Sequence, residues 1–323
     1  MAPSTYLQVT LQERPPADIT PTTFKQEIVP FNLKAGAGQI LVKILYLSLD
    51  PALRGAMKDQ RSYMPPVKIG AVMRGTAFGE VLETGPGSKF KVGDIVEGTF
   101  GWREYGVFDD KFATKLDLQP GMDILDYMGP LGLTAYFGLL DVGKLKAGET
   151  LVVSGAAGAT GSVVCQIGKK LGAKSPEFYN DFKKAVGYFD VYFDNVGGDI
   201  LNFALTRLNK GARIVFCGAI SDYNTTKPTG LTSYMNLISQ RAKIEGFLVF
   251  VIPPWCKHIL VFANATRTFV SLDYVNRFAE ARQEISQWLK EGSIKRRFHV
   301  VQGLQNAPQS LNLLFNGGNT GKL

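Results

Sequence analysis

The sequence predicts an α/β protein with two domains, one rich in β-strands and one built on a parallel sheet. Short segments that are rich in branched residues and bounded by Gly or Pro, such as 39–47 and 79–84, indicate strands in roughly the first 115 residues. From about Pro120 onward, helix-like stretches alternate with compact apolar runs, which is typical of buried parallel strands joined by helices. A length of 323 residues also favours a division into domains.

The elements of the second part follow from these periodicities. Helices are expected at 131–140, 163–171 and 279–291, with Gly292 closing the last of them. Strands are expected at 149–154, 190–194, 212–217 and 297–301, and helix-like sequence around residue 200 separates two of them.

Composition and charge exclude several classes of protein. The chain is 45% hydrophobic and 20% charged, it contains no run of about 18 apolar residues, and its start does not resemble a signal peptide. We therefore expect a cytoplasmic protein without a membrane partner. The formal charge of +8 is dispersed, without a basic block interleaved with aromatic residues, so we expect no nucleic-acid partner.

The cysteines and histidines argue against a metal site. Cys165, Cys217 and Cys256 are far apart, and the two histidines, His258 and His299, both occur late in the chain. A disulfide framework, a zinc site and a Ser-His-Asp triad are thereby disfavoured.

A glycine-rich loop at 153–164 joins an expected strand to an expected helix. Ala156, Gly158 and Gly161 form an A-x-G-x-x-G variant of the dinucleotide fingerprint, in which small residues let the backbone approach a pyrophosphate at a helix N-terminus. The alternative is a tight turn without a ligand. The strand that should follow, ending in a residue that contacts the ribose, has no counterpart, because the polar, Pro-containing segment 175–179 comes directly after Lys174.

Several motifs occur in a characteristic order: LYLSLDPALR (45–54), SYMPP (62–66), VMRG (72–75), GLTAY (132–136), the glycine loop, FDNVGG (193–198), CGAISDYN (217–224) and NTGK (319–322). Together they resemble the zinc-independent medium-chain dehydrogenases/reductases, in particular the prostaglandin reductase, leukotriene B4 12-hydroxydehydrogenase and alkenal double-bond reductase group.

The resemblance implies a GroES-like β-barrel domain at 1–117 and 297–323 and a Rossmann-type, doubly wound domain at 118–296. It further implies an NADP(H)-dependent enzyme that reduces the carbon-carbon double bond of an enone or alkenal. Dimers are common in this group, so a homodimer is one expectation. The scarcity of histidine and clustered cysteine agrees, because the zinc-dependent relatives need both.

Two departures from the family pattern stand out. About 25 to 30 residues are absent after Lys174, where the second Rossmann strand and the lysine for the 2′-phosphate belong, and the segment from Val251 to Leu272 is an insertion. We expect a mis-spliced gene model with one strand of the sheet missing. Genuine lineage-specific change is the alternative.

The resemblance and the loop positions together give the candidate site. Tyr223 is the candidate catalytic donor to the substrate enolate, the alternative being packing and a bond to the cofactor ribose. Ala52 and Tyr63 match substrate-pocket positions. The candidate cofactor-binding residues are Pro51, Thr134, Gly155, Ala157, Gly158, Ala159, Thr160, Asn195, Cys217, Ser221, Tyr223, Phe247, Val249 and Asn319. Asn195 could equally form a turn, and Phe247 and Val249 could be plain core residues.

Three functions remain open from the sequence. The first is NADPH-dependent reduction of an activated carbon-carbon double bond. The second is a quinone or alcohol oxidoreductase on the same scaffold. The third is a non-catalytic product of a defective transcript with impaired cofactor binding.

Overall fold

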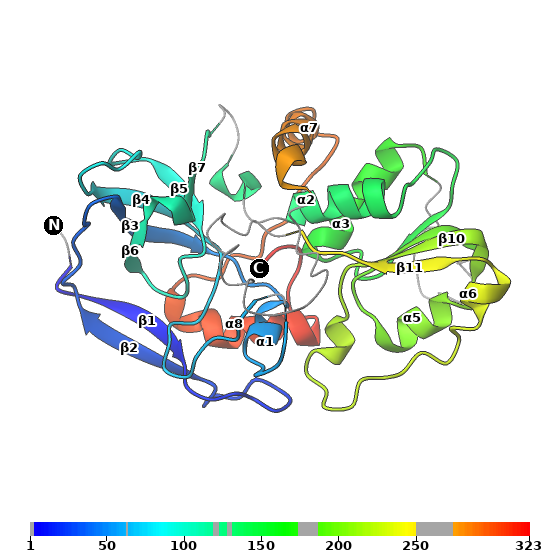
Figure 1. Ribbon diagram of the computed structural model, residues 1–323, viewed down its shortest axis with the longest axis horizontal. Coiled ribbons are helices and arrows are strands. Elements are labelled where there is room, and N and C mark those ends of the chain that lie inside the picture. Colours follow the sequence, from blue (N-terminus) through cyan, green and yellow to red (C-terminus); the bar gives the residue numbers. More distant parts are fainter. Residues whose placement is uncertain (1–2, 63, 119–122, 128–130, 174–186, 250–273) are drawn as a thin grey trace, which may run out of the picture.

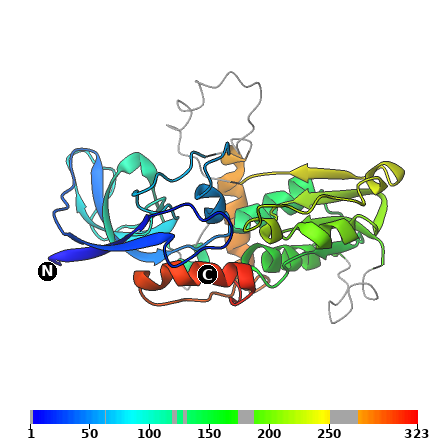
Figure 2. The same ribbon diagram turned by 90° about the horizontal axis from the view of Figure 1, so that it is seen from below.

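A computed structural model describes residues 3–62, 64–118, 123–127, 131–173, 187–249 and 274–323. It contains an antiparallel part and a parallel part, each built around its own sheet. The two sheets lie at opposite ends of the molecule. Helix α7 (Phe278–Lys290) lies between them, and helix α8 (Ala307–Asn316) lies along the antiparallel part (Figure 2). The predicted combination of a GroES-like domain and a Rossmann-type domain is confirmed.

The antiparallel part consists of a hairpin and a curled five-stranded sheet. In the hairpin, β1 (Thr5–Leu11) pairs with β2 (Phe24–Pro30). The sheet has the order β6 (Tyr105–Asp109), β3 (Gln39–Leu47), β4 (Ala77–Thr84), β5 (Ile95–Gly98) and β7 (Ala113–Lys115). Alternate residues such as Ile40, Val42 and Val81 are fully buried inside the curl, as the period of a half-buried strand requires.

Short helical segments connect and cover these strands. They are α1 (Leu53–Ala56), η1 (Asp110–Phe112), η2 (Ile124–Tyr127) and η8 (Leu304–Asn306), whereas η7 (Val275–Arg277) leads directly into α7. The predicted helix at 131–140 is present as α2 (Leu131–Phe137), which continues into a π-helical turn at Gly138–Val142.

The parallel sheet has four described strands in the order β11 (Lys243–Gly246), β10 (Leu208–Phe216), β9 (Phe189–Asp194) and β8 (Leu151–Val153). Between them lie α3 (Ala159–Lys170), α5 (Gly198–Ala204), η4 (Ile220–Asp222) and α6 (Asn236–Ser239). Figure 1 shows α2, α3 and α7 on one face of this sheet and α5 on the other.

Both faces of the parallel sheet are buried, which explains the uninterrupted apolar runs of its strands. On one face Val153, Phe193 and Val215 pack with α2, α3 and α7. On the other face Tyr192 and Ile214 pack with α5.

The hand of the connections bears on the expected missing strand. Helix α3 follows β8 and covers one face of the sheet, whereas α5 connects β9 to β10 across the other face. If β8 were connected directly to β9 through α3, the connections β8 to β9 and β9 to β10 would therefore have opposite hands. About 98% of such crossovers are right-handed, and the right-handed path from α3 leads to a strand on the far side of β8. The described residues place no strand there. The break after Lys174 and the segment from Val251 to Leu272 both lie outside the described residues.

Two expectations need correction. The helix after the glycine loop begins at Ala159 rather than Val163, because Gly158 already serves as its N-cap. The predicted strand at 297–301 is wrong: only Phe298 forms a bridge, to Lys322, since Gly321 at φ +73° ends the extended run of the partner segment. None of the helices in the described ranges is long and apolar enough to cross a bilayer.

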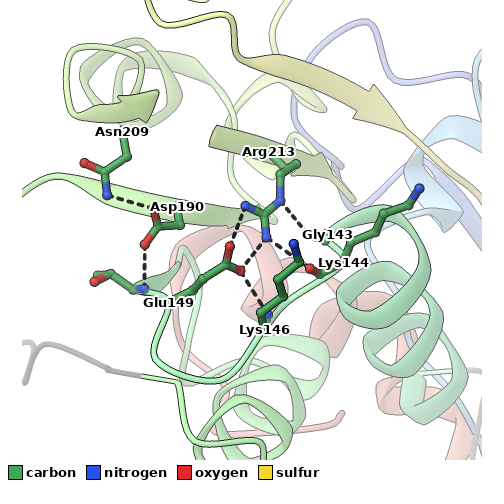
Figure 3. A network of polar contacts seen from close by, with 8 residues as sticks. Gly143, Lys144, Lys146, Glu149, Asp190, Asn209 and Arg213 are labelled. Carbon is green, nitrogen blue, oxygen red and sulfur yellow. Dashed lines mark hydrogen bonds and ion pairs between the residues drawn. The ribbon is translucent and has the colours of Figure 1, made fainter. Parts of the chain in front are cut away.

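A polar network ties together the amino ends of the parallel strands (Figure 3). Arg213 on β10 donates to both Glu149 carboxylate oxygens and to the carbonyls of Gly143 and Lys144. Asp190 on β9 accepts from the Thr150 N–H at 2.9 Å and from Asn209 at 2.8 Å. Burial raises the pKa of Glu149, but hydrogen bonds from Arg213 and the Lys146 N–H outweigh burial and leave this pKa below its ordinary value of 4.5.

The substitution Arg213→Met should lower the free energy of unfolding at pH 7 by about 1.5 to 3 kcal/mol, because the charge-assisted hydrogen bonds to Glu149 are lost. A lowered folded-state pKa means that the Glu149 contribution is present above pH 4.5 and is lost as pH falls through the folded value. Urea unfolding should therefore show the deficit shrinking below about pH 4.5. The exposed pair Lys243–Glu245 offers the control Lys243→Met, expected within about 0.5 kcal/mol of wild type. Equal losses in both variants would contradict the assignment.

Candidate functional site

The candidate site lies at the carboxyl edge of the parallel sheet, where ligands of open α/β sheets bind. Each strand there ends in a loop that contains predicted site residues. Gly155 follows β8, Asn195 follows β9, Cys217 follows β10 and Phe247 follows β11. The parallel arrangement therefore brings together residues that are almost 100 positions apart.

The glycine loop has the geometry of an anion cradle. Gly155 has φ +60°, and a Cβ at Gly161 would lie 2.3 Å from the Gly155 carbonyl oxygen, so only glycine fits at position 161. The first turn of α3, with Ala159 and Thr160, carries no acidic residue. Its backbone N–H groups and helix dipole therefore suit a pyrophosphate.

A buried carboxylate, Asp194, organises this edge, although it was not predicted from the sequence as a site residue. Its side chain accepts hydrogen bonds from Ser154 Oγ at 2.7 Å, the Tyr192 hydroxyl at 3.2 Å and the N–H groups of Val196 and Gly197. Burial raises the pKa of Asp194 although these bonds oppose the shift. The available signal was an acidic residue at the end of an otherwise apolar strand.

Asn195 and Ser221 fix the same loops. The Asn195 side-chain amide donates to the Ser154 carbonyl at 2.8 Å, and Ser221 Oγ donates to the Val196 carbonyl at 2.6 Å. One N–H of the Asn195 side-chain amide is therefore engaged in holding the loop, which leaves its second N–H and its Oδ1 to meet a ligand.

Beside these loops a cleft of about 390 Å³ opens at the ends of β10 and β11. Three of the predicted residues, Cys217, Tyr223 and Phe247, line it together with Phe216, Gly218, Ala219, Gly246 and Leu248. Its volume is in the usual range for small-molecule sites, and its walls are mainly apolar.

Tyr223 is the one hydroxyl donor among the residues that line this cleft. Its oxygen lies 3.4 Å from the Ala219 N–H, from which it accepts. Burial raises the pKa of Tyr223, and burial together with Asp194 raises the pKa of the Cys217 thiol to about 12. Both groups keep their protons at neutral pH, so Tyr223 can donate a hydrogen bond to a ligand.

The antiparallel part contacts the segment that carries Tyr223 through Arg54, a residue that was not predicted from the sequence. Arg54 is fully buried, and its Nε donates to Asn224 Oδ1 at 3.0 Å, next to Tyr223. Asn224 in turn donates to Asp18. Ala52, two residues before Arg54, is exposed at the start of α1, whereas Tyr63 lies outside the described residues.

The remaining predicted residues are distributed around the cleft. Asn319 and Pro51 belong to two segments that meet beside the glycine loop, where Gly321 pairs with Gly158. Thr134 is partly buried on α2, and Ala157 is exposed in the loop. Val249 is 3% exposed in the core that covers α2 and α3, so any ligand contact there would be through its backbone. In the described ranges, no three His, Cys, Asp or Glu side chains are placed to hold a metal ion.

Comparisons with known proteins agree with this architecture. Residues 7–116 match a family described as the N-terminal domain of oxidoreductase. The NADPH-dependent curcumin reductase of Escherichia coli (strain K12) is 35% identical over 89% of this chain and 87% of its own length. The 2-alkenal reductase (NADP(+)-dependent) of Nicotiana tabacum is 31% identical over 92% of this chain and 90% of its own.

A solved structure extends the likeness to three dimensions. The crystal structure of CurA in complex with NADPH from Vibrio vulnificus has a TM-score of 0.82 and 34% identity, covering 98% of this chain and 97% of that one. The chain therefore belongs to the zinc-independent, NADP-dependent medium-chain dehydrogenase/reductase family, in the group that includes alkenal, prostaglandin and curcumin reductases.

Proposed function

We propose that the protein uses NADPH to reduce the carbon-carbon double bond of α,β-unsaturated aldehydes or ketones. The observation that carries the proposal is the cleft at the carboxyl ends of β10 and β11, which has a protonated tyrosine on an apolar wall. The relatives named for curcumin and 2-alkenal reduction support the substrate class. An enone or alkenal as small-molecule partner and a cytoplasmic location belong to the same proposal.

The residues present fit a dinucleotide. The glycine loop and the first turn of α3 would hold the pyrophosphate, and the cleft at Cys217 and Phe247 would hold the nicotinamide end. When bound, NADPH supplies the hydride.

The remaining work falls to the chain. Tyr223 donates its hydroxyl proton in a hydrogen bond to the carbonyl oxygen, where negative charge develops as the β-carbon is reduced. Phe216, Phe247 and Leu248 form apolar walls, which limit water and strengthen that bond. Arg54 holds Asn224 and thereby the segment that carries Tyr223.

With a simple enone or alkenal as substrate, the purified protein should oxidise NADPH and return the saturated carbonyl compound. The physical reason is that a tyrosine placed at the carbonyl oxygen stabilises an enolate, whereas zinc-assisted carbonyl reduction needs metal ligands. Chromatography of the products measures the outcome. Formation of the allylic alcohol, or activity with quinones alone, would contradict the proposal.

The substitution Tyr223→Phe should lower kcat by about 10- to 1000-fold, because removing one positioned hydrogen-bond donor costs up to about 1000-fold. Tyr188 is 61% exposed and lies outside the residues that line the cleft, so Tyr188→Phe is the matched control and should retain wild-type turnover. Steady-state kinetics with a saturating enone makes the comparison. A wild-type kcat in Tyr223→Phe would contradict the donor role and show that Tyr223 contributes only packing.

Cofactor selectivity tests the break after Lys174. We expect this chain to bind NADPH weakly and to discriminate poorly against NADH, because the strand that carries the ribose contact has no counterpart in the sequence. Losing one charge-assisted phosphate contact costs about 1.5 to 3 kcal/mol, or roughly 10- to 150-fold in affinity.

The matched comparison is a version with the family-length segment restored after Lys174 and residues 251–272 removed. Calorimetric titration of both versions with NADPH and NADH measures the difference. A micromolar, NADPH-selective dissociation constant for the present chain would show that the break is tolerated.

A further inference from the structure

A lysine lies buried where the antiparallel part meets the glycine loop. Lys322 is only 4% exposed, and lysine is almost never buried to that extent without a partner. Its Nζ donates to the Leu49 carbonyl at 2.6 Å and to Asp50 Oδ1 at 2.8 Å. The ammonium therefore binds the two residues immediately before Pro51.

The acceptor is itself held in place. Asp50 Oδ2 accepts from Ser48 Oγ at 2.6 Å, and Ser48 is buried. Burial lowers the pKa of Lys322, while the Asp50 charge opposes that shift. An apolar side chain at position 322 would remove a hydrogen-bond donor from both the Leu49 carbonyl and the Asp50 carboxylate in a mostly buried environment.

The backbone of Lys322 joins two further segments to this turn. Its N–H donates to the Arg297 carbonyl at 2.8 Å, and its carbonyl accepts from the His299 N–H at 2.7 Å. The Leu49 N–H donates to the Leu323 carbonyl at 3.1 Å. Side chain and backbone thus fix the C-terminal segment against the turn at 48–51.

The residue before Lys322 contacts the glycine loop. Gly321 pairs with Gly158, the N-cap of α3, and a Cβ at Gly321 would lie 2.3 Å from the Arg297 carbonyl oxygen. Asn319 donates to the Gly321 carbonyl at 2.9 Å. Lys322 therefore connects the pyrophosphate cradle on one sheet with the turn of Pro51 on the other.

We infer that Lys322 is a positioning residue for the cofactor: its buried ammonium clamps the turn at Leu49–Asp50 to the segment that lies on Gly158. The two halves of the dinucleotide site, carried by different sheets, are then held in one geometry. This inference rests on the proposed function. A shift of about 1 Å between binding groups can cost 100-fold in rate, so the clamp has a measurable consequence.

Lys322→Met keeps the apolar stem and removes the charge. We expect kcat/KM for NADPH to fall by about 10- to 100-fold, with the larger part in KM. Hydrogen–deuterium exchange should show faster exchange of the glycine loop, residues 155–161. The control Lys115→Met breaks a 2.6 Å ion pair with Asp94 on the antiparallel sheet and should change neither quantity.

Asp50→Asn provides a second, milder variant, since an amide oxygen still accepts from Lys322 but carries no charge. It should change KM and loop exchange in the same direction by a smaller factor, and it carries the test if Lys322→Met does not fold. Native KM and native loop exchange in a folded Lys322→Met or Asp50→Asn protein would overturn the clamp. If the unmodified chain reduces no enone, the proposed function fails, while loop exchange still decides the clamp.

Discussion

The candidate site depends on one buried carboxylate. Asp194 is 0% exposed, a position that a charged group keeps only when it is hydrogen-bonded on all sides. Its donors come from the glycine loop through Ser154, from its own strand through Tyr192, and from the following turn through Gly197. Its backbone carbonyl also accepts from Cys217 after β10. The loops after three parallel strands are thus fixed to one another before any ligand arrives.

A second constraint is that the two sheets must be held in a fixed relative position. The contacts that achieve this join residues very distant in sequence: Arg54 with Asn224, and Gly158 with Gly321. Both connections are made by buried or tightly packed groups, whose replacement leaves an unpaired partner or a steric clash. The relative position of the sheets is therefore specified by polar contacts of defined geometry as well as by apolar area, and polar contacts tolerate little displacement.

Local patterns made much of the fold predictable. Apolar runs predicted strands at 190–194 and 212–217, which the structure contains within β9 and β10 except for residue 217, and small residues predicted the turn at Gly158. Both features depend on neighbours in the sequence, so a single sequence shows them. The same reasoning failed at 297–301, where the partner segment rather than the local sequence limits pairing. The roles of Asp194 and Arg54 were missed for the same reason, since their partners lie on other elements and a single sequence does not show them.

The residues for the reaction and the residue for nucleotide selectivity follow different strands of the parallel sheet. The segments after β8, β9, β10 and β11 carry the cradle and the cleft, and the described residues include the first three, together with residues 247–249 after β11. The residue that distinguishes the ribose hydroxyl from its phosphate follows a strand beyond β8 in this fold, and the described residues place none there. Because Asp194 binds the loops of β8 and β9 from the inner side, loss of an outer strand leaves that network intact. The catalytic edge can thus keep its geometry while nucleotide selectivity is altered.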